Sequence, residues 1–264
     1  MTRRLTSKQI RRMIEAPNLF LMLDCDGTLA PLARHYEKAV FPKRTRSILG
    51  RIQSLPDSNI AIISGRELAG IRKFAGMRGL IYAGNHGLEI KAGAEKWIHP
   101  GAKRALRLMK QLAFVLRGLL EYFPKAGLED KRFGLSLHYR LLSRDRAEML
   151  LFAVRSAVQP FVKAHRVSIQ KGKKVLELRP YVNWNKGSAV RWLLKKYYRG
   201  KEVLPVFIGD DETDEKAFRA VARGISIRVG RSAETCADFF VGSHREVQNL
   251  LRRILSGREA RSRG

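Results

Sequence analysis

Residues 19–29 read LFLMLDCDGTL, so five consecutive apolar residues run directly into Asp24, Cys25, Asp26 and Gly27. A short apolar run that ends in polar residues and glycine is typical of a buried parallel strand. Gly27 allows the chain to turn sharply after the two carboxylates. Two carboxylates at such a strand end can divide catalytic work, because one can act as a nucleophile while the other moves a proton.

Two other interpretations compete for this stretch. A calcium-binding loop also begins with Asp-x-Asp, but it requires a glutamate at its twelfth position, where this chain has His35. An ordinary turn stabilised by an aspartate side chain fits the same residues. The stretch alone therefore predicts a strand and a turn, and its chemistry depends on which groups lie beside it.

Three further apolar runs end in polar or glycine-rich turns: 60–63 before Ser64-Gly65-Arg66, 80–83 before Gly84-Asn85-His86-Gly87, and 204–208 before Gly209-Asp210-Asp211. Helical patterns at 43–54 and 186–198 alternate with these strands, which predicts an α/β fold with a Rossmann-like parallel sheet. Ligands bind outside the carboxyl ends of the strands in such sheets. We therefore expect the polar clusters to meet at one edge.

Two of the clusters offer groups that can hold a phosphate. The Ser64 hydroxyl and nearby backbone N–H groups suit a phosphoryl oxygen, although Ser64 followed by Glu67 also fits a helix-capping box. Lys186 precedes an apolar helical pattern and can place an ammonium against an anion. The alternative for Lys186 is a lysine that merely faces solvent.

Residues 209–215 read GDDETDE, with five carboxylates in six residues of a strongly basic chain. Unpaired carboxylates repel one another, and a hard cation with oxygen ligands, such as Mg²⁺, relieves that repulsion. An acidic helix N-terminus is the alternative, because the helix dipole favours negative charge there. That alternative accounts for residues 212–215 better than for Asp210 and Asp211.

The middle of the chain predicts an inserted α+β domain. Helical patterns at 106–123 and 144–162 alternate with strand patterns at 134–139 and 174–178. We place this domain at 105–181, between two parts of a core domain at 1–104 and 182–264. We expect the Arg-, Ser- and Gly-rich tail at 256–264 to be disordered.

The composition narrows the class of protein. The chain has 52 Lys and Arg against 24 Asp and Glu, a formal net charge of +28, but no nucleic-acid-binding motif. We expect a basic surface, with nucleic-acid binding by an inactive phosphatase fold as the alternative of another class. Two distant cysteines, no apolar run of roughly 20 residues and no signal-peptide pattern favour a cytoplasmic protein without a membrane partner. We expect a monomer.

Taken together, the clusters resemble the motifs of haloacid-dehalogenase superfamily phosphatases, and more specifically those of trehalose-6-phosphate phosphatases. The segments that carry the resemblance are 23–29, 63–66, 84–89, 129–131, 136–140, 172–180, 185–187 and 209–215. Cys25 departs from the tyrosine or phenylalanine that is commoner in the family between the two aspartates. Its side chain has no chemical role there, so we expect the change to be tolerated.

The resemblance implies a haloacid-dehalogenase-type core with an α+β cap that hydrolyses trehalose 6-phosphate through an aspartyl-phosphate. It implies that Asp24 is the nucleophile, that Asp26 is the acid and base, and that Ser64 and Lys186 neutralise the phosphoryl oxygens. It also implies a Mg²⁺ ion held by Asp24, the Asp26 carbonyl and Asp210, with Asp211 and Asp214 as ligands or near neighbours.

The resemblance further assigns substrate binding to residues of both domains: Ser64, Gly65, Arg66 and His86 in the core, and Glu129, Lys131, Arg140, Lys173 and Glu177 in the cap. The alternative is that the cap cations and Glu177 merely pair across a sheet. Another sugar phosphate, such as glucosyl- or mannosyl-phosphoglycerate, remains the alternative substrate.

Overall fold

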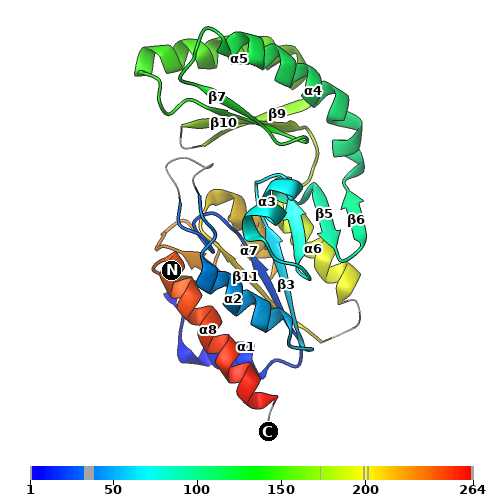
Figure 1. The fold of residues 1–264 in the computed structure, drawn as a ribbon, viewed down its shortest axis with the longest axis vertical. Helices are drawn as coiled ribbons and strands as arrows, with labels where there is room; N and C mark the ends of the chain where they lie inside the picture. The colour runs from blue at the N-terminus through cyan, green and yellow to red at the C-terminus, as the bar shows by residue number, and fades with distance from the viewer. Residues whose placement is uncertain (1, 33–38, 173, 199, 201, 263–264) are drawn as a thin grey trace. The chain divides into compact units, whose positions relative to one another are not determined.

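The computed structural model describes residues 2–32, 39–172, 174–198, 200 and 202–262. The chain forms two compact units: residues 1–97 with 184–264, and residues 98–183 (Figure 1). No helix among the described residues is long and apolar enough to cross a membrane. The expected boundary at 104/105 lies inside helix α4 (Pro100–Leu120), all of which belongs to the second unit.

A nine-stranded sheet forms the centre of the first unit, in the order β1-β13-β12-β11-β2-β3-β4-β5-β6. Its strands are β1 (Arg3–Arg4), β2 (Leu19–Leu23), β3 (Ser58–Ile63), β4 (Ile81–Gly84), β5 (Glu89–Ala92), β6 (Glu95–Ile98), β11 (Leu204–Gly209), β12 (Ile225–Val229) and β13 (Phe239–Val241). The pairs from β1 across to β4 are parallel, and β5 joins β4 antiparallel.

Helices cover both faces of this sheet, and the residues of β2 show why its sequence is apolar throughout. Leu19, Leu21 and Leu23 pack into one core with α1 (Ser7–Glu15), α2 (Lys43–Gln53), α3 (Leu68–Ala75) and α8 (His244–Arg261). Phe20 and Met22 pack into a second core with α6 (Lys186–Tyr197) and α7 (Glu215–Ala220). Alternate side chains of a strand point to opposite faces, so a strand buried on both faces has no polar alternation. The expected α/β fold is confirmed.

The second unit is a four-stranded antiparallel sheet covered on one face by two helices. The strand order is β7 (Gly127–Asp130), β8 (Leu135–His138), β10 (Val175–Pro180) and β9 (Val167–Gly172). Leu135, Leu137, Leu176 and Leu178 pack against α4 and α5 (Arg144–Lys163). Because side chains alternate along each strand, the residues between these leucines form the opposite, polar face of the sheet.

The expectation of a disordered tail is wrong for residues 256–261, which belong to α8. Arg258 is only 1% exposed, and its Nη1 donates hydrogen bonds to the carbonyl oxygens of Met13, Ile14 and Ala16 at 2.9–3.1 Å. These carbonyls end α1 and would otherwise lack partners. One arginine in a stretch that composition marks as disordered therefore anchors the last turns of α8.

Candidate active site

Asp24 and Lys186 form a buried ion pair at the carboxyl edge of the first unit's sheet. Asp24 follows β2 directly, and its backbone N–H donates to the Ile208 carbonyl of the neighbouring strand β11 at 2.8 Å. Lys186 is the first residue of α6, and its Nζ lies 2.6 Å from Asp24 Oδ1 and 2.7 Å from Asp214 Oδ1. Lys186 is 2% exposed, which excludes a lysine that merely faces solvent.

Local packing explains how α6 delivers this lysine. The Asn185 side chain caps the helix by accepting from Ser188 N–H at 3.2 Å. A Cβ on Gly187 would lie 2.2 Å from the Lys216 carbonyl oxygen, so glycine is needed for α6 to approach α7. The segment Asn185-Lys186-Gly187 therefore supplies the helix cap, the buried ammonium and the glycine at the helix contact, in that order.

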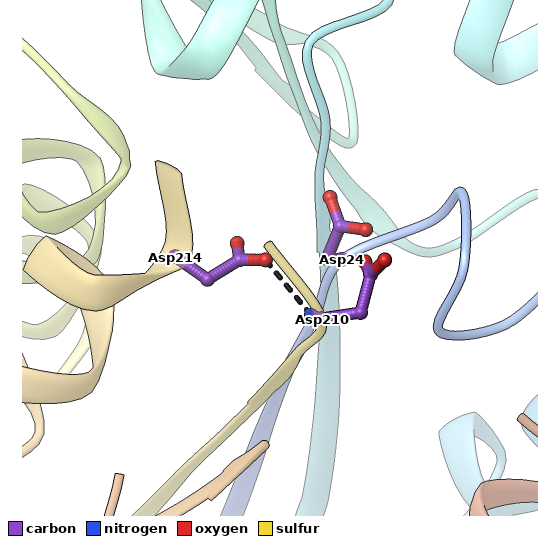
Figure 2. A group of neighbouring side chains, drawn as sticks. All are labelled: Asp24, Asp210 and Asp214. Carbon is purple, nitrogen blue, oxygen red and sulfur yellow. Dashed lines mark hydrogen bonds between the residues drawn. The ribbon is translucent and has the colours of Figure 1, made fainter. Parts of the chain in front are cut away.

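Three carboxylates gather here, and two of them contact this ammonium. Asp24, Asp210 and Asp214 offer ligand atoms that all lie within 4.8 Å of one another (Figure 2). Asp214 is held from two further sides, because its Oδ2 accepts from Asp210 N–H at 3.0 Å and from Asp211 N–H at 3.1 Å. The Asp210 side chain instead approaches Thr28, whose hydroxyl donates to Asp210 Oδ1 at 3.4 Å.

The charges in this cluster do not balance. Burial, followed by the charges of Asp214 and Asp211, raises the pKa of Asp210 to about 7. Burial also raises the pKa of Asp24 well above its usual value, although Lys186 opposes this. For Lys186 itself, burial alone would lower the pKa, but the carboxylates of Asp214 and Asp24 outweigh burial and raise it well above its usual value. One ammonium faces three carboxylates, and such an oxygen-rich, electron-rich set fits a hard divalent cation.

Gly27 brings the loop after β2 against this cluster. Its φ of +92° is a conformation that favours glycine, and a Cβ there would lie 2.1 Å from Asp210 Oδ2. The glycine in the opening stretch of sequence is thus required twice, once for the turn and once for the approach of the Asp210 carboxylate.

Asp211 lies outside the three-carboxylate cluster. Its Oδ1 accepts from Thr213 N–H at 2.7 Å and from the Thr213 hydroxyl at 2.6 Å, and it caps the short helix η3 (Glu212–Asp214). Burial acts to raise the pKa of Asp211, but Lys186 and the Thr213 hydrogen bonds outweigh it and lower the pKa. The acidic segment therefore contains both a helix cap and part of the cluster.

Arg66 holds Asp26 in a bidentate ion pair. Arg66 Nε lies 2.7 Å from Asp26 Oδ2, and Arg66 Nη2 lies 2.6 Å from Asp26 Oδ1. The guanidinium also stacks over the Phe74 ring, 4.2 Å from its centroid. Two contacts fix the plane of the guanidinium, so Arg66 orients the second carboxylate of the opening stretch.

Ser64 does not form the capping box that its spacing to Glu67 allows. Helix α3 begins only at Leu68, with Glu67 as its N-cap and no hydrogen bond from that side chain to the helix start. The Ser64 hydroxyl accepts from Arg66 N–H at 3.1 Å. The Leu68 N–H is satisfied instead by Glu89 Oε1 at 2.9 Å.

A turn at 85–87 braces this loop from the neighbouring strand. Asn85 and His86 have φ values of 50° and 57°, and their N–H groups donate to the Arg66 and Ser64 carbonyls at 2.7 and 2.9 Å. A Cβ on Gly65 would lie 2.8 Å from the His86 ring, so the ring packs closely on the glycine. The structure thus brings Ser64, Gly65, Arg66 and His86 together.

Two scaffold residues of this region were not predicted to have a role. Glu89 is 1% exposed, and its Oε1 also accepts from the Asn85 side chain at 3.0 Å, so it joins the 85–87 turn to the start of α3. Thr28 supports Asp210. The sequence feature that could have identified Glu89 is a single acidic residue between the apolar residues Leu88 and Ile90.

The polar face of the second unit gathers several of the residues expected in a cap. Strand pairing sets Glu129 opposite Ser136, and Ser136 opposite Glu177. Lys131 Nζ lies 3.3 Å from Glu177 Oε1 and 3.8 Å from Glu129 Oε2. These contacts form the cross-strand pairing considered above, and they also line up hydrogen-bonding groups on one face.

Two residues that contact Glu129 and Glu177 were not predicted to have a role. His138 Nε2 lies 3.2 Å from Glu129 Oε2, and Arg179 forms an ion pair with Glu177. Arg140 follows β8 and is exposed. Lys173 lies outside the described residues.

The chain is similar to known proteins along most of its length. The family model for trehalose-phosphatase matches residues 22–245. The chain is 29% identical to trehalose-phosphate phosphatase B of Arabidopsis thaliana over 262 residues, covering 94% of this chain and 69% of the relative. It is 34% identical to the trehalose-phosphate phosphatase of Mycobacterium tuberculosis over 242 residues, covering 89% of this chain and 60% of that relative.

Solved structures show the same fold. The C-terminal domain of the Candida albicans trehalose-6-phosphate phosphatase aligns with a TM-score of 0.82 at 24% identity, covering 97% of this chain and 98% of that domain. A trehalose-6-phosphate phosphatase related protein aligns with a TM-score of 0.79 at 26% identity, covering 90% of this chain and 97% of that one.

Proposed function

The chain belongs to the trehalose-phosphatase family, and from this premise we propose that it hydrolyses trehalose 6-phosphate to trehalose and inorganic phosphate. The observation that carries the proposal is the Asp24–Lys186 pair beside Asp210 and Asp214, with Asp26 held by Arg66. A nucleophilic carboxylate, a second carboxylate for proton transfer and a fixed cation are the groups that phosphoryl transfer through a covalent intermediate requires.

In the proposed first step, an oxygen of Asp24 attacks phosphorus in line with the leaving sugar oxygen. The new bond is an acyl phosphate, the bond from phosphorus to the sugar oxygen breaks, and Asp26 gives its proton to that oxygen. In the second step Asp26 takes a proton from water, and the water oxygen attacks the phosphorus of the aspartyl-phosphate. Phosphate leaves, and Asp24 and Asp26 return to their starting states.

In this scheme Asp26 must leave its pair with Arg66 and take up a proton from solvent before it can protonate the leaving oxygen. We propose that phosphate binding draws the Arg66 guanidinium toward the phosphoryl oxygens and releases Asp26. The Lys186 ammonium and the Ser64 hydroxyl then neutralise and hold the same oxygens. Such fixed groups stabilise charge in the transition state without reorganising during the reaction.

The family implies a divalent metal ion, and the three-aspartate cluster is suited to hold one. We propose Mg²⁺ with Asp24, Asp210 and the Asp26 carbonyl as its protein ligands, and Asp211 and Asp214 as supporting groups. When bound, the ion would neutralise the phosphoryl oxygens and orient the phosphate against Asp24. Asp214 would act mainly by fixing Lys186 and the 210–211 backbone, because both of its oxygens already accept hydrogen bonds.

We propose that the second unit is the cap that selects the sugar. Its polar face presents Glu129, Lys131 and Glu177, carboxylates and a cation suited to sugar hydroxyls, and Arg140 and Lys173 are proposed to join them. Groups placed to bind hydroxyls are left unpaired by the wrong sugar, so they discriminate strongly.

A screen of phosphate release tests the proposal, with trehalose 6-phosphate, glucose 6-phosphate, glucosyl-phosphoglycerate and p-nitrophenyl phosphate as substrates. We expect trehalose 6-phosphate to give the highest kcat/KM, and Asp24→Asn to abolish turnover while the protein stays folded. A preference for glucosyl-phosphoglycerate would change the proposed substrate but leave the proposed phosphoryl-transfer mechanism in place. A folded Asp24→Asn variant with near-wild-type activity would contradict the covalent mechanism.

A further inference from the structure

A groove with a volume of about 420 Å³ lies on the first unit, between α1 and α8. Its lining comprises three arginines, two serines and two isoleucines: Arg11, Arg252 and Arg253, Ser7 and Ser256, and Ile10 and Ile14. No carboxylate is among these lining residues. An open groove of this volume is in the range of ligand sites, and each of its polar side chains can donate hydrogen bonds to an anion.

The groove is separate from the active site. It contains none of the residues described there, and α8 places it toward the opposite edge of the sheet. Arg258, two residues beyond Ser256, forms an ion pair with Asp57, which directly precedes β3 at the amino ends of the strands. The active-site loops follow the carboxyl ends of the same strands.

Among the described residues, no carboxylate forms an ion pair with the arginines of the groove. Neither Arg11 nor Arg253 has a hydrogen-bond or ion-pair partner among the described residues. Within the part of the chain that the structure describes, Arg252 donates only to the neutral Asn249 side chain, at 3.2 Å. Elsewhere on these two helices, Arg258 and Arg261 are bonded to several carbonyl oxygens. All three arginines are exposed, and three like charges gathered around one groove attract an anion.

The two helices are locked together, so the groove is preformed. Arg258 and Arg261 both bond the carbonyl oxygens that end α1, including that of Ala16. Ile10 is 6% exposed and belongs to the core beneath the groove. Because the backbone around the groove is fixed, ligand binding has to order only the exposed arginine and serine side chains.

We propose that this groove binds a small ligand that carries a diphosphate or triphosphate group. The planar guanidinium of arginine matches phosphate oxygens in pairs, and the two serine hydroxyls can donate to the same oxygens. Three cations suit a ligand with about three negative charges, and the isoleucine floor suits the organic part of the ligand. The site is independent of the proposed phosphatase function and provides a place for an anionic effector.

Calorimetric titration with pyrophosphate, and separately with ADP, tests the site in the presence of chelator, so that divalent cations do not recruit the anion to the active site. We expect one binding event in the titration, and we expect the bound ligand to raise the melting temperature of the protein in thermal melting. The double substitution Arg11→Gln with Arg253→Gln should weaken binding at least tenfold and remove the thermal shift. Its activity on p-nitrophenyl phosphate should match the wild type.

Arg107→Gln, which removes an exposed arginine from α4 in the other unit, is the matched control and should leave binding unchanged. If this control weakens binding equally, the effect depends on the general charge of the protein, and the proposed site is overturned. Wild-type affinity in the double variant would also overturn it. Loss of binding in Arg66→Gln alone would place the anion in the active site and would overturn the proposal as well.

Discussion

The Lys186 ammonium lies 2.6 Å from Asp24 Oδ1, and the two side chains are only 2% and 7% exposed. The same ammonium lies 2.7 Å from Asp214 Oδ1, whose side chain is fully buried. A buried cation shared by two buried carboxylates is held by charge on both sides. Removing it leaves both carboxylates without a counter-charge in a region that is largely shielded from water.

Lys186→Met should therefore destabilise the protein as well as inactivate it. Breaking a buried pair by removing one partner costs about 3–5 kcal/mol in comparable cases. Urea unfolding measures this loss, and phosphate release should fall to background. Lys186→Arg, which keeps the charge, should recover most of the stability but not the activity. A Met variant as stable as the wild type would show that the ammonium does not neutralise the two carboxylates.

Gly27→Ala should abolish activity through a steric effect on Asp210. Its φ of +92° strains any other residue, and the added Cβ would lie 2.1 Å from Asp210 Oδ2. Gly93→Ala is the matched control, because Gly93 also has a positive φ, +56°, but nothing lies within 4 Å of its Cβ. We expect the control to lose about 1 kcal/mol of stability from strain alone and to keep its activity. Equal activity in the two variants would remove the steric role of Gly27.

The strand ends were the most predictable part of the site, and the reason is physical. A strand buried on both faces has to be apolar throughout, so the change from Leu23 to Asp24 is visible in the sequence. The parallel order of β2, β3 and β11 then brings Asp24, Ser64 and Asp210 to one edge. The apolar run of each strand and the parallel order of the sheet lead to the same arrangement. For this reason the sequence was sufficient to predict both the fold and the gathering of these residues at one edge.

Long-range side-chain contacts could not be anticipated in the same way. The pairing of Arg66 with Asp26 joins residues 40 positions apart, and nothing in either local pattern specifies it. Arg258 was placed in a disordered tail because composition alone cannot show that an arginine will meet the end of α1. Buried polar residues such as Glu89 likewise depend on partners that only the folded chain supplies.

The metal proposal predicts that chelator stops phosphate release and that Mg²⁺ restores it. Asp210→Asn removes one charge from the three-aspartate cluster while keeping its shape, so it should raise the Mg²⁺ concentration needed for half-maximal activity by at least tenfold. Glu212→Gln, in the same acidic segment but outside the cluster, is the control and should leave that concentration unchanged. Full activity in excess chelator would refute a metal role.

Acid stability should depend on the contact between Asp57 and Arg258. Partial burial acts to raise the pKa of Asp57, but the hydrogen bond and charge of Arg258, helped by Ser58, outweigh burial and lower it. A carboxyl with a lowered folded-state pKa contributes stability that is fully present above its unfolded pKa, near 3.9, and is lost as pH falls through the folded pKa.

Unfolding free energies of wild type and Asp57→Asn, compared between pH 7 and pH 2.5, measure this contribution. The wild type should be more stable at pH 7, by about 1 kcal/mol or less because Asp57 is partly exposed. The difference should shrink as the pH falls below about 4. A difference that stays constant with pH would mean that the ionised carboxylate contributes nothing and that the variant acts through packing.

The choice of sugar is predicted to depend on the polar face of the second unit. Glu129 and Glu177 lie on this face with Lys131 between them, all partly exposed and able to meet hydroxyl groups. Glu129→Ala or Glu177→Ala should lower kcat/KM for trehalose 6-phosphate at least tenfold, since each change leaves sugar hydroxyls without a hydrogen-bonding partner in the complex. The same variants should hydrolyse p-nitrophenyl phosphate, which has no sugar, within about twofold of the wild type.

Glu148→Ala is the matched control for these two changes. Glu148 is an exposed glutamate on α5 of the same unit, and its one ion pair among the described residues is with Arg144, one helical turn away. Its loss should therefore change the activity on neither substrate. Because Glu177 also pairs with Lys131 and Arg179, thermal melting must show that the Glu177 variant is folded. If a folded variant loses activity on both substrates equally, Glu129 and Glu177 support the fold or the site in the first unit. If only the sugar substrate is lost, the carboxylates contact the sugar, because p-nitrophenyl phosphate tests the same phosphate chemistry without it.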